Sequence, residues 1–144
     1  MRLHPVIENT VRRVGRFHAR LYRWSGGTGR LGRDTLVLTT RGRKTGREVP
    51  APLYYVAEGE LLYVVASFGG NDNAPQWYRN LVADPEVTVE RGAVRARYRA
   101  RSLTREEIKP IWPKLLEMYP PYQTYQERTN RLIPVVELTP IAGG

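Results

Sequence analysis

The chain has 144 residues, no cysteine and a formal net charge of +9 at pH 7. This length predicts one domain that buries a core without disulfides. The lack of cysteine excludes a disulfide framework, a thiolate metal site and a cysteine nucleophile. A basic chain favours anionic partners, which are nucleic acid, an acidic lipid surface or a phosphorylated small molecule.

The sequence contains no run of about 18 apolar residues, the length that a membrane-spanning helix requires. Its N-terminus also lacks the apolar core and cleavage site of a secretory signal. We therefore expect a cytoplasmic protein, with peripheral attachment at the inner face of the cell membrane as an open alternative.

Residues 1–33 are expected to form a basic amphipathic helix and a linker. They contain eight arginines and one glutamate. Within residues 5–24, apolar side chains recur at steps of three or four and form one stripe, made of Ile7, Val11, Val14, Phe17, Leu21 and Trp24. Such a helix either packs on the domain with a solvated arginine face or lies on an anionic membrane.

The rest of the chain, residues 34–144, predicts an α+β domain in which antiparallel strands form a small β-barrel flanked by helices. We expect strands at 35–40, 49–57, 61–67, 86–90, 93–101 and 133–138. Helices are expected after Asn73, after the capping box that begins at Thr104, and at 122–130. Pro110 and Pro113 predict a kink in the second helix.

In the predicted strand 93–101, four arginines alternate with Val94, Ala96, Tyr98 and Ala100. We call this set, Arg95, Arg97, Arg99 and Arg101, the arginine face. It is either a surface that grips RNA or the solvated side of an antiparallel sheet, and the second is the more common origin of this pattern.

Several kinds of catalytic site are excluded. The only histidines, His4 and His18, lie in the N-terminal segment, so no metal-ligand spacing or serine–histidine pair is evident. The phosphate-binding motifs of dinucleotide-binding folds and P-loop enzymes are absent. Difficult chemistry would therefore have to come from a bound cofactor.

Residues 39–82 contain the candidate site. Arg43, Lys44 and the amides that follow them can cradle a phosphate, or they can form an ordinary charged turn. Residues 66–70 let the backbone approach a flat ring. The side chains of Trp77, Tyr78 and Asn80 can contact a ligand or pack in the core.

Four segments in this stretch resemble the deazaflavin-dependent nitroreductase family of actinobacteria. They are Gly42-Arg43-Lys44-Thr45-Gly46, Pro52-Leu53, Ala66-Ser67-Phe68-Gly69-Gly70 and residues 75–81, and residues 119–135 match as well. The resemblance covers about residues 30–140. It implies a split β-barrel related to flavin-binding barrels and the cofactor F420, an 8-hydroxy-5-deazaflavin, in preference to FMN.

The same resemblance implies the site residues and no metal. Ser67, Tyr119, Tyr122 and Tyr125 are expected to contact the acceptor. The residues expected to bind the cofactor are Arg43, Lys44, Thr45, Val49, Pro50, Ala51, Pro52, Leu53, Tyr54, Val65, Ala66, Ser67, Phe68, Gln76, Trp77, Tyr78, Arg79, Asn80 and Tyr122. At Val49 the family commonly has an arginine, and Arg47 can substitute for it.

The implied activity is hydride transfer from reduced F420 to a quinone or a similar electron-poor acceptor, such as a nitroaromatic or an enone. The alternative is a non-catalytic binder of F420, a flavin or a haem-like ring. The expected partners are a small-molecule acceptor and an anionic membrane surface contacted by residues 5–24, with no nucleic acid. The oligomeric state is left open, with a dimer as one option.

Overall fold

The computed structural model describes residues 34–67, 70 and 73–142. The helix expected at 5–24 and the side chain of Phe68 lie outside these residues. The described elements are β1 (Thr35–Arg41), β2 (Glu48–Tyr54), β3 (Val56–Glu58), β4 (Leu61–Val65), α2 (Gln76–Ala83), β5 (Glu86–Arg91), β6 (Val94–Ser102), α3 (Arg105–Met118), α4 (Pro121–Glu127) and β7 (Val135–Pro140).

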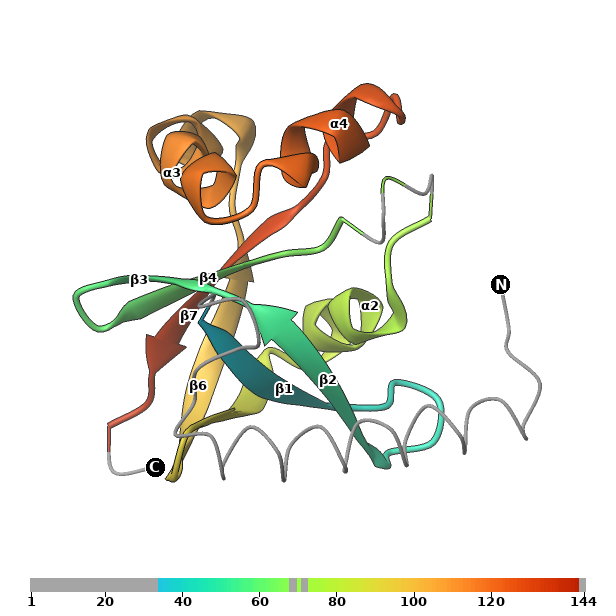
Figure 1. Cartoon of the computed structure of the whole chain (residues 1–144). Helices are drawn as coiled ribbons and strands as arrows, with labels where there is room; N and C mark the ends of the chain where they lie inside the picture. Colours follow the sequence, from blue (N-terminus) through green and yellow to red (C-terminus); the bar gives the residue numbers. More distant parts are fainter. Residues whose placement is uncertain (1–33, 68–69, 71–72, 143–144) are drawn as a thin grey trace.

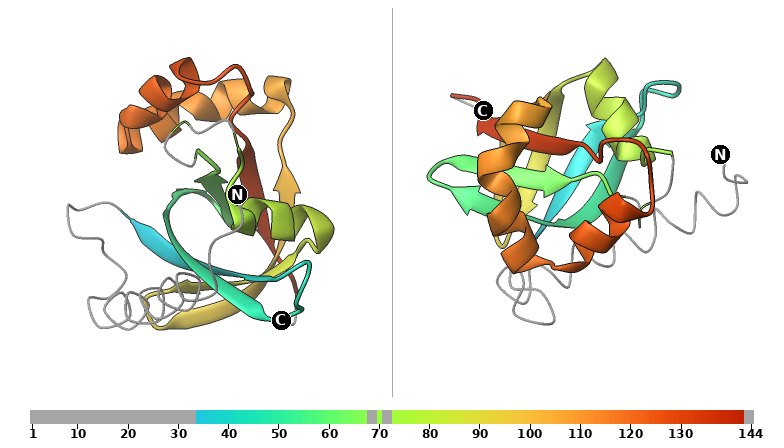
Figure 2. Two further views of the ribbon diagram at one scale, coloured as in Figure 1. Left: turned by 90° about the vertical axis from the view of Figure 1, so that its right-hand side faces the viewer. Right: turned by 90° about the horizontal axis from the view of Figure 1, so that it is seen from above.

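The strands form one antiparallel sheet in the order β2-β1-β5-β6-β7-β4-β3. The sheet curls strongly, with α2 beside it and α3 and α4 over one end (Figure 1). Viewed from above, α3 and α4 lie across the strands (Figure 2). This architecture confirms the predicted split β-barrel with flanking helices.

The sheet separates two apolar cores. On β4, Leu62 and Val64 enter the core inside the curl, whereas Tyr63 and Val65 pack against the α3–α4 side. Successive side chains of a strand point to opposite faces, so β4 is buried on both sides. The core inside the curl also receives Trp77 and Leu81 from α2.

The arginine face is the solvated side of the sheet, and each of its members lies within 4 Å of a carboxylate. The ion pairs are Arg95 with Glu90, Arg97 and Arg99 with Glu86, and Arg101 with both Glu107 and Glu137. To bind RNA phosphates, these guanidinium groups would have to give up their carboxylate partners. The structure therefore favours the interpretation of this face as the solvated side of an antiparallel sheet.

Three predicted element boundaries need correction. The strand expected at 49–57 is two strands that break at Tyr55, whose N–H donates to the Asp34 carbonyl at 3.2 Å. The last helix spans Pro121–Glu127 instead of 122–130. The final strand begins at Val135, because residues 133 and 134 belong to the connection before it.

Helix α3, which is the helix expected after the capping box at Thr104, is one continuous element despite Pro110 and Pro113. Both prolines are exposed, as are Glu106 and Lys109, whose carbonyls lose their helical donors. Water can satisfy those carbonyls, so the helix continues. The capping box at Thr104 and Glu107 is present as predicted.

Helix α2 has Pro75 at its N-cap and no side-chain cap, so the Asn73 cap is not formed. Proline fits this end because its fixed backbone angle suits a helix start and no amide partner is needed there. No helix of the described residues is long and apolar enough to cross a bilayer.

Candidate functional site

A pocket of about 430 Å³ lies between the sheet and the α3–α4 layer. Three parts of the chain supply its walls. The strands contribute Thr35, Pro52, Leu53, Tyr54 and Val65, the connection after β4 contributes Ser67, and the α3–α4 layer contributes Tyr119, Tyr122 and Tyr125. The fold therefore brings eight of the predicted site residues together with Thr35, which was not predicted.

The edge strand β2 forms one wall of the pocket. Pro52 pairs with Val37 and Pro50 with Thr39 across the β1–β2 ladder. Proline has no N–H to donate, so it is tolerated mainly at a sheet edge, and β2 is an edge strand. The prolines also protect this edge from pairing with another strand.

The opposite wall consists of Tyr119, Tyr122 and Tyr125 from the α3–α4 layer, and we call it the tyrosine wall. The Tyr119 ring centroid lies 5.3 Å from that of Tyr54 and 4.8 Å from that of Tyr122. The hydroxyls of Tyr119 and Tyr125 are 3.0 Å apart and share a hydrogen bond. Tyr122 is only 5% exposed, so this wall is held rigidly by packing.

Ser67 follows β4 directly, where the chain leaves the sheet. Its carbonyl accepts a hydrogen bond from the Gly70 N–H at 2.9 Å. Gly70 has a φ of +80°, and a Cβ on it would lie 2.7 Å from the Tyr125 carbonyl oxygen. Only glycine fits this close approach, so the segment that carries Ser67 packs directly against the backbone of α4.

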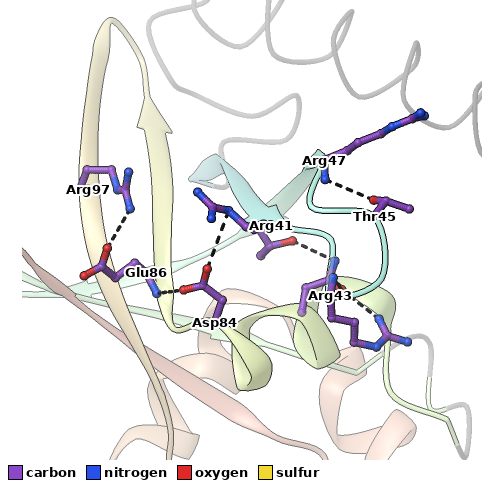
Figure 3. A network of polar contacts seen from close by, with 9 residues as sticks. Arg41, Arg43, Thr45, Arg47, Asp84, Glu86 and Arg97 are labelled. Atoms are coloured by element: carbon purple, nitrogen blue, oxygen red, sulfur yellow. Dashed lines mark hydrogen bonds and ion pairs between the residues drawn. The ribbon is translucent and has the colours of Figure 1, made fainter.

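The turn between β1 and β2 is tightly formed. The Gly42 N–H donates to the Arg47 carbonyl at 2.7 Å, and the Gly46 N–H donates to the Gly42 carbonyl at 2.8 Å. The Arg47 N–H donates to Thr45 Oγ1 at 3.2 Å. We call residues 42–47 the cationic turn (Figure 3).

Asn80 fixes the cationic turn to α2. Its Oδ1 accepts from the Arg43 backbone N–H at 3.2 Å and from the Arg43 guanidinium at 2.9 Å, and its Nδ2 donates to Thr40 Oγ1 at 3.2 Å. Asn80 is 3% exposed and does not line the pocket. Its geometry is that of a residue that positions Arg43.

Other predicted residues of α2 lie elsewhere. Trp77 is 8% exposed and packs in the core inside the curl. The Tyr78 hydroxyl shares a hydrogen bond of 2.9 Å with Ser102 Oγ at the end of β6. Gln76 and Arg79 belong to the same helix, and none of these four side chains lines the pocket.

The remaining predicted residues flank the pocket without lining it. Val49, Pro50 and Ala51 precede the lining residues on β2, and Ala66 is fully buried next to Ser67. Lys44 and Thr45 are exposed in the cationic turn. Within residues 34–67, 70 and 73–142, no carboxylate lies in ion-pair distance of Lys44 or Arg47.

Sequence reasoning missed Thr35 and Arg131. Thr35 begins β1 and is carried into the pocket by the pairing of Thr35 with Tyr54, a register that the sequence does not specify. The Arg131 guanidinium lies against the carbonyls of Ala66, Ser67 and Asn73. The matching of residues 131–135 to the family was the available signal, but it gave no role to this side chain.

Among the residues that the structure describes, the pocket lining contains no carboxylate, histidine, lysine or arginine. Three groups outside this lining, Tyr63, Arg101 and Glu107, have shifted pKa values and belong to a hydrogen-bond network with Glu137. Burial and the hydrogen bond to Glu137 raise the pKa of Tyr63, hydrogen bonds to Glu107 and Glu137 raise that of Arg101, and the Thr104 amide lowers that of Glu107. Because the polar side chains among these described lining residues are hydroxyls of threonine, serine and tyrosine, the pocket suits a reaction whose redox chemistry belongs to a cofactor.

The pocket and the cationic turn lie at opposite ends of β2. Arg47 precedes the strand, and Leu53 lies six residues further on, which corresponds to about 20 Å at the rise of an extended strand. A ligand that contacts both ends must be long, flat at one end and anionic at the other.

The model of the F420H(2)-dependent quinone reductase family matches residues 14–140 of this chain. The chain belongs to this family. An F420H(2)-dependent quinone reductase of Mycobacterium tuberculosis H37Rv is 35% identical over an alignment that covers 86% of this chain and 88% of that protein.

Two solved structures are also similar. An F420-H2-dependent reductase, FDR-A, has 40% sequence identity and a TM-score of 0.67, with 72% of this chain and 92% of that chain covered. A structure described as a domain-swapped dimer has 34% identity and a TM-score of 0.69, with 88% and 98% covered.

Coenzyme F420 is therefore the cofactor of this protein's family, and the described residues fit it. The cofactor joins a planar deazaflavin to a tail that carries phosphate and glutamate. The aromatic pocket suits the planar part, and the cationic turn suits the anionic tail at a distance that matches an elongated ligand.

Proposed function

We propose that this protein transfers a hydride from reduced F420 to a quinone that stacks against the tyrosine wall of the pocket. The observation that carries the proposal is the pairing of a pocket whose described lining residues are neutral with a cationic turn about 20 Å away along β2. Neutral walls admit planar acceptors, and the cations hold an anionic tail.

The residues that would hold the cofactor come from three places. Arg43, Lys44 and the amides of the cationic turn would bind the phosphate of the tail. Pro52, Leu53 and Tyr54 would contact one face of the ring system, and Val65 its edge. When bound, reduced F420 supplies the hydride, and a quinone that takes up this hydride and one proton becomes the hydroquinone.

Ser67 would stabilise the acceptor as negative charge develops on its oxygen. Ser67 lines the pocket, and a hydroxyl fixed in a water-poor site can donate to an oxyanion without further reorganisation. Thr35 also lines the pocket and would supply a second hydroxyl for orientation.

The tyrosine wall would orient the acceptor and supply a proton. Tyr119 and Tyr122 have rings whose faces favour stacking with a flat acceptor. The hydrogen bond between the Tyr119 and Tyr125 hydroxyls lets one of them donate to the acceptor oxygen while the other replaces the proton from solvent.

The proposal extends to other electron-poor acceptors. Because the described lining residues include no charged side chain to select a particular substituent, nitroaromatics and enones of similar size should enter as well. We propose that they are reduced more slowly than quinones, since a quinone becomes an aromatic hydroquinone when it takes up the hydride.

The deciding experiment measures oxidation of reduced F420 by menadione, followed by the recovery of F420 absorbance, in parallel with a binding titration of F420 and FMN. Turnover with preference for F420 supports the enzyme. Binding without turnover would instead indicate a protein that only sequesters the cofactor.

Ser67→Ala provides the test of the acceptor site. Loss of one oxyanion donor typically lowers kcat by about 100-fold or more, whereas the dissociation constant of F420 should change far less, because Ser67 is assigned to the acceptor. An equal loss in turnover and cofactor affinity would contradict this assignment.

We also propose that residues 5–24, whose pattern is basic and amphipathic, contact an anionic membrane and bring the pocket close to a lipid quinone. The test is sedimentation of the full chain with vesicles of anionic or neutral lipid, compared with a chain that begins at residue 34. Equal binding of both chains to anionic vesicles would overturn the proposal.

A further inference from the structure

Arg131 lies in the connection between α4 and β7 and takes no part in the proposed reaction. Its Nη2 is 3.3 Å from the Ala66 carbonyl oxygen, 3.2 Å from that of Ser67 and 3.4 Å from that of Asn73. One cationic group therefore holds the two ends of the connection between β4 and α2, and one of these ends carries Ser67.

These contacts have a clear physical reason. The chain leaves the sheet after Val65, so the carbonyls of Ala66 and Ser67 lie outside the strand ladder, and the Ser67 carbonyl accepts from Arg131 in addition to the Gly70 N–H. A guanidinium gives them charge-assisted hydrogen bonds, which are stronger than those of neutral donors. The same segment makes a further hydrogen bond to the connection before β7, in which the Ala66 N–H donates to the Pro134 carbonyl at 2.9 Å.

Gln126 fixes the backbone of Arg131 to α4. Its Nε2 donates to the Arg131 carbonyl at 2.8 Å, and its Oε1 accepts from the Ile133 N–H at 2.9 Å. Gln126 follows directly on Tyr125, whose hydroxyl faces Tyr119. Gln126, which the peptide bond joins to Tyr125 of the tyrosine wall, is thus hydrogen-bonded to the backbone of Arg131, and the Arg131 guanidinium is hydrogen-bonded to the segment that carries Ser67.

We propose that Gln126 and Arg131 form a clasp that sets the separation between Ser67 and the tyrosine wall, and thereby the fit of the acceptor. Arg131 is a positioning residue in this scheme, because it reaches backbone carbonyls and not the pocket itself. The proposal rests on the proposed function, since it assigns the two walls to the acceptor.

The clasp predicts a specific kinetic pattern. The Arg131 guanidinium contacts the segment that carries Ser67, on the acceptor side of the pocket, whereas β2 and the cationic turn are assigned to the cofactor. Loosening the clasp should therefore impair the use of the acceptor and spare F420 affinity. A purely stabilising role would not separate the two.

The experiment compares Arg131→Ala, Arg131→Lys and Gln126→Met with wild type. A displaced reacting group can cost about 100-fold, so we expect kcat/KM for menadione to fall by roughly 10- to 100-fold in Arg131→Ala. The dissociation constant of F420 should stay within about threefold, which corresponds to less than about 1 kcal/mol of binding free energy. Added guanidinium ion should restore part of the activity of Arg131→Ala, and equal ionic strength of sodium chloride should not.

Arg105→Gln is the matched control, because Arg105 is an exposed arginine of α3 outside the site. It should leave kcat/KM unchanged. The combined Arg131→Ala and Gln126→Met variant should lose less than the product of the two single losses, because both act through one clasp.

Hydrogen exchange of the Gly70 and Ala66 amides tests the clasp without any turnover. Both should exchange faster in Arg131→Lys and Gln126→Met than in wild type, while the Val64 amide of β4 keeps its protection. Unchanged exchange together with unchanged kcat/KM would overturn the clasp. So would a parallel loss of F420 affinity and turnover without guanidinium rescue. An inactive wild type with altered exchange in the variants would instead contradict only the proposed function.

Discussion

Two arginine-rich regions of this protein look alike in the sequence and differ in the structure. On the arginine face of β6, each guanidinium lies close to a carboxylate. In the cationic turn, Arg43 is held by the amide of Asn80, and within the described residues Lys44 and Arg47 have no acidic partner. Positive charge alone therefore does not identify a binding site, and we propose that charge which the fold leaves unneutralised is the better indication.

The physical reason is that a paired cation has already exchanged part of its hydration for a partner. To bind an anion it must give up that partner, and the net gain is small. Asn80 has the opposite effect, because a neutral amide orients Arg43 without cancelling its charge. Four predictions test this difference, beginning with the largest expected effect.

The combined variant Lys44→Ala and Arg47→Ala should weaken F420 binding by roughly 100-fold, since each charge-assisted contact contributes about 1.5 kcal/mol or more. The matched control is Arg97→Ala with Arg99→Ala, which removes the same charge from the arginine face. Fluorescence titration of F420 at low and high salt measures both. Similar losses in the two double variants would mean that only net charge matters.

Asn80→Leu should destabilise the fold by about 1–3 kcal/mol, because Thr40 and the Arg43 amide lose a buried partner. It should also weaken F420 binding, since Arg43 is no longer oriented. Urea unfolding and the same titration measure the two effects. A destabilised variant with normal F420 affinity would show that the position of Arg43 is unimportant.

Gly46→Ala should cost about 1 kcal/mol, because Gly46 has a φ of +71° and open space around it, so only the backbone is strained. Gly59→Ala at the β3–β4 turn is the control, with a φ of +58° and the same open surroundings. Both variants should unfold at similarly lower urea concentration. Only Gly46→Ala should reduce F420 affinity, and a matching reduction in Gly59→Ala would contradict the assignment.

Glu107→Gln should have the smallest effect, and it should depend on pH. The hydrogen bond from the Thr104 amide, and then the one from Arg101, lower the pKa of the Glu107 carboxyl below its ordinary value. A carboxylate with a lowered pKa stabilises the fold above its unfolded pKa and loses this contribution as the pH falls through the folded value.

Thermal unfolding of wild type and Glu107→Gln should therefore differ most near neutral pH and converge in acid. F420 affinity should be the same in both proteins, because the ion pairs of the arginine face serve the fold. A pH-independent difference would show that the carboxylate charge contributes nothing.

Much of this protein is determined locally by its sequence. The strand pattern of β1 and β6, the capping box at Thr104 and the turn residues at Gly46, Gly59 and Gly92 follow from short-range rules of periodicity and backbone conformation. The order of motifs from the cationic turn to residues 119–135 was also sufficient to indicate the family and its cofactor.

The tertiary structure alone decided which of these residues meet. Trp77 and Asn80 are on one short helix, yet one packs in the core and the other holds Arg43. Thr35 reaches the pocket only through its register with Tyr54, and Arg131 reaches Ser67 across 64 residues of chain. Burial, strand register and ion pairing depend on contacts between distant segments, and no local pattern specifies them.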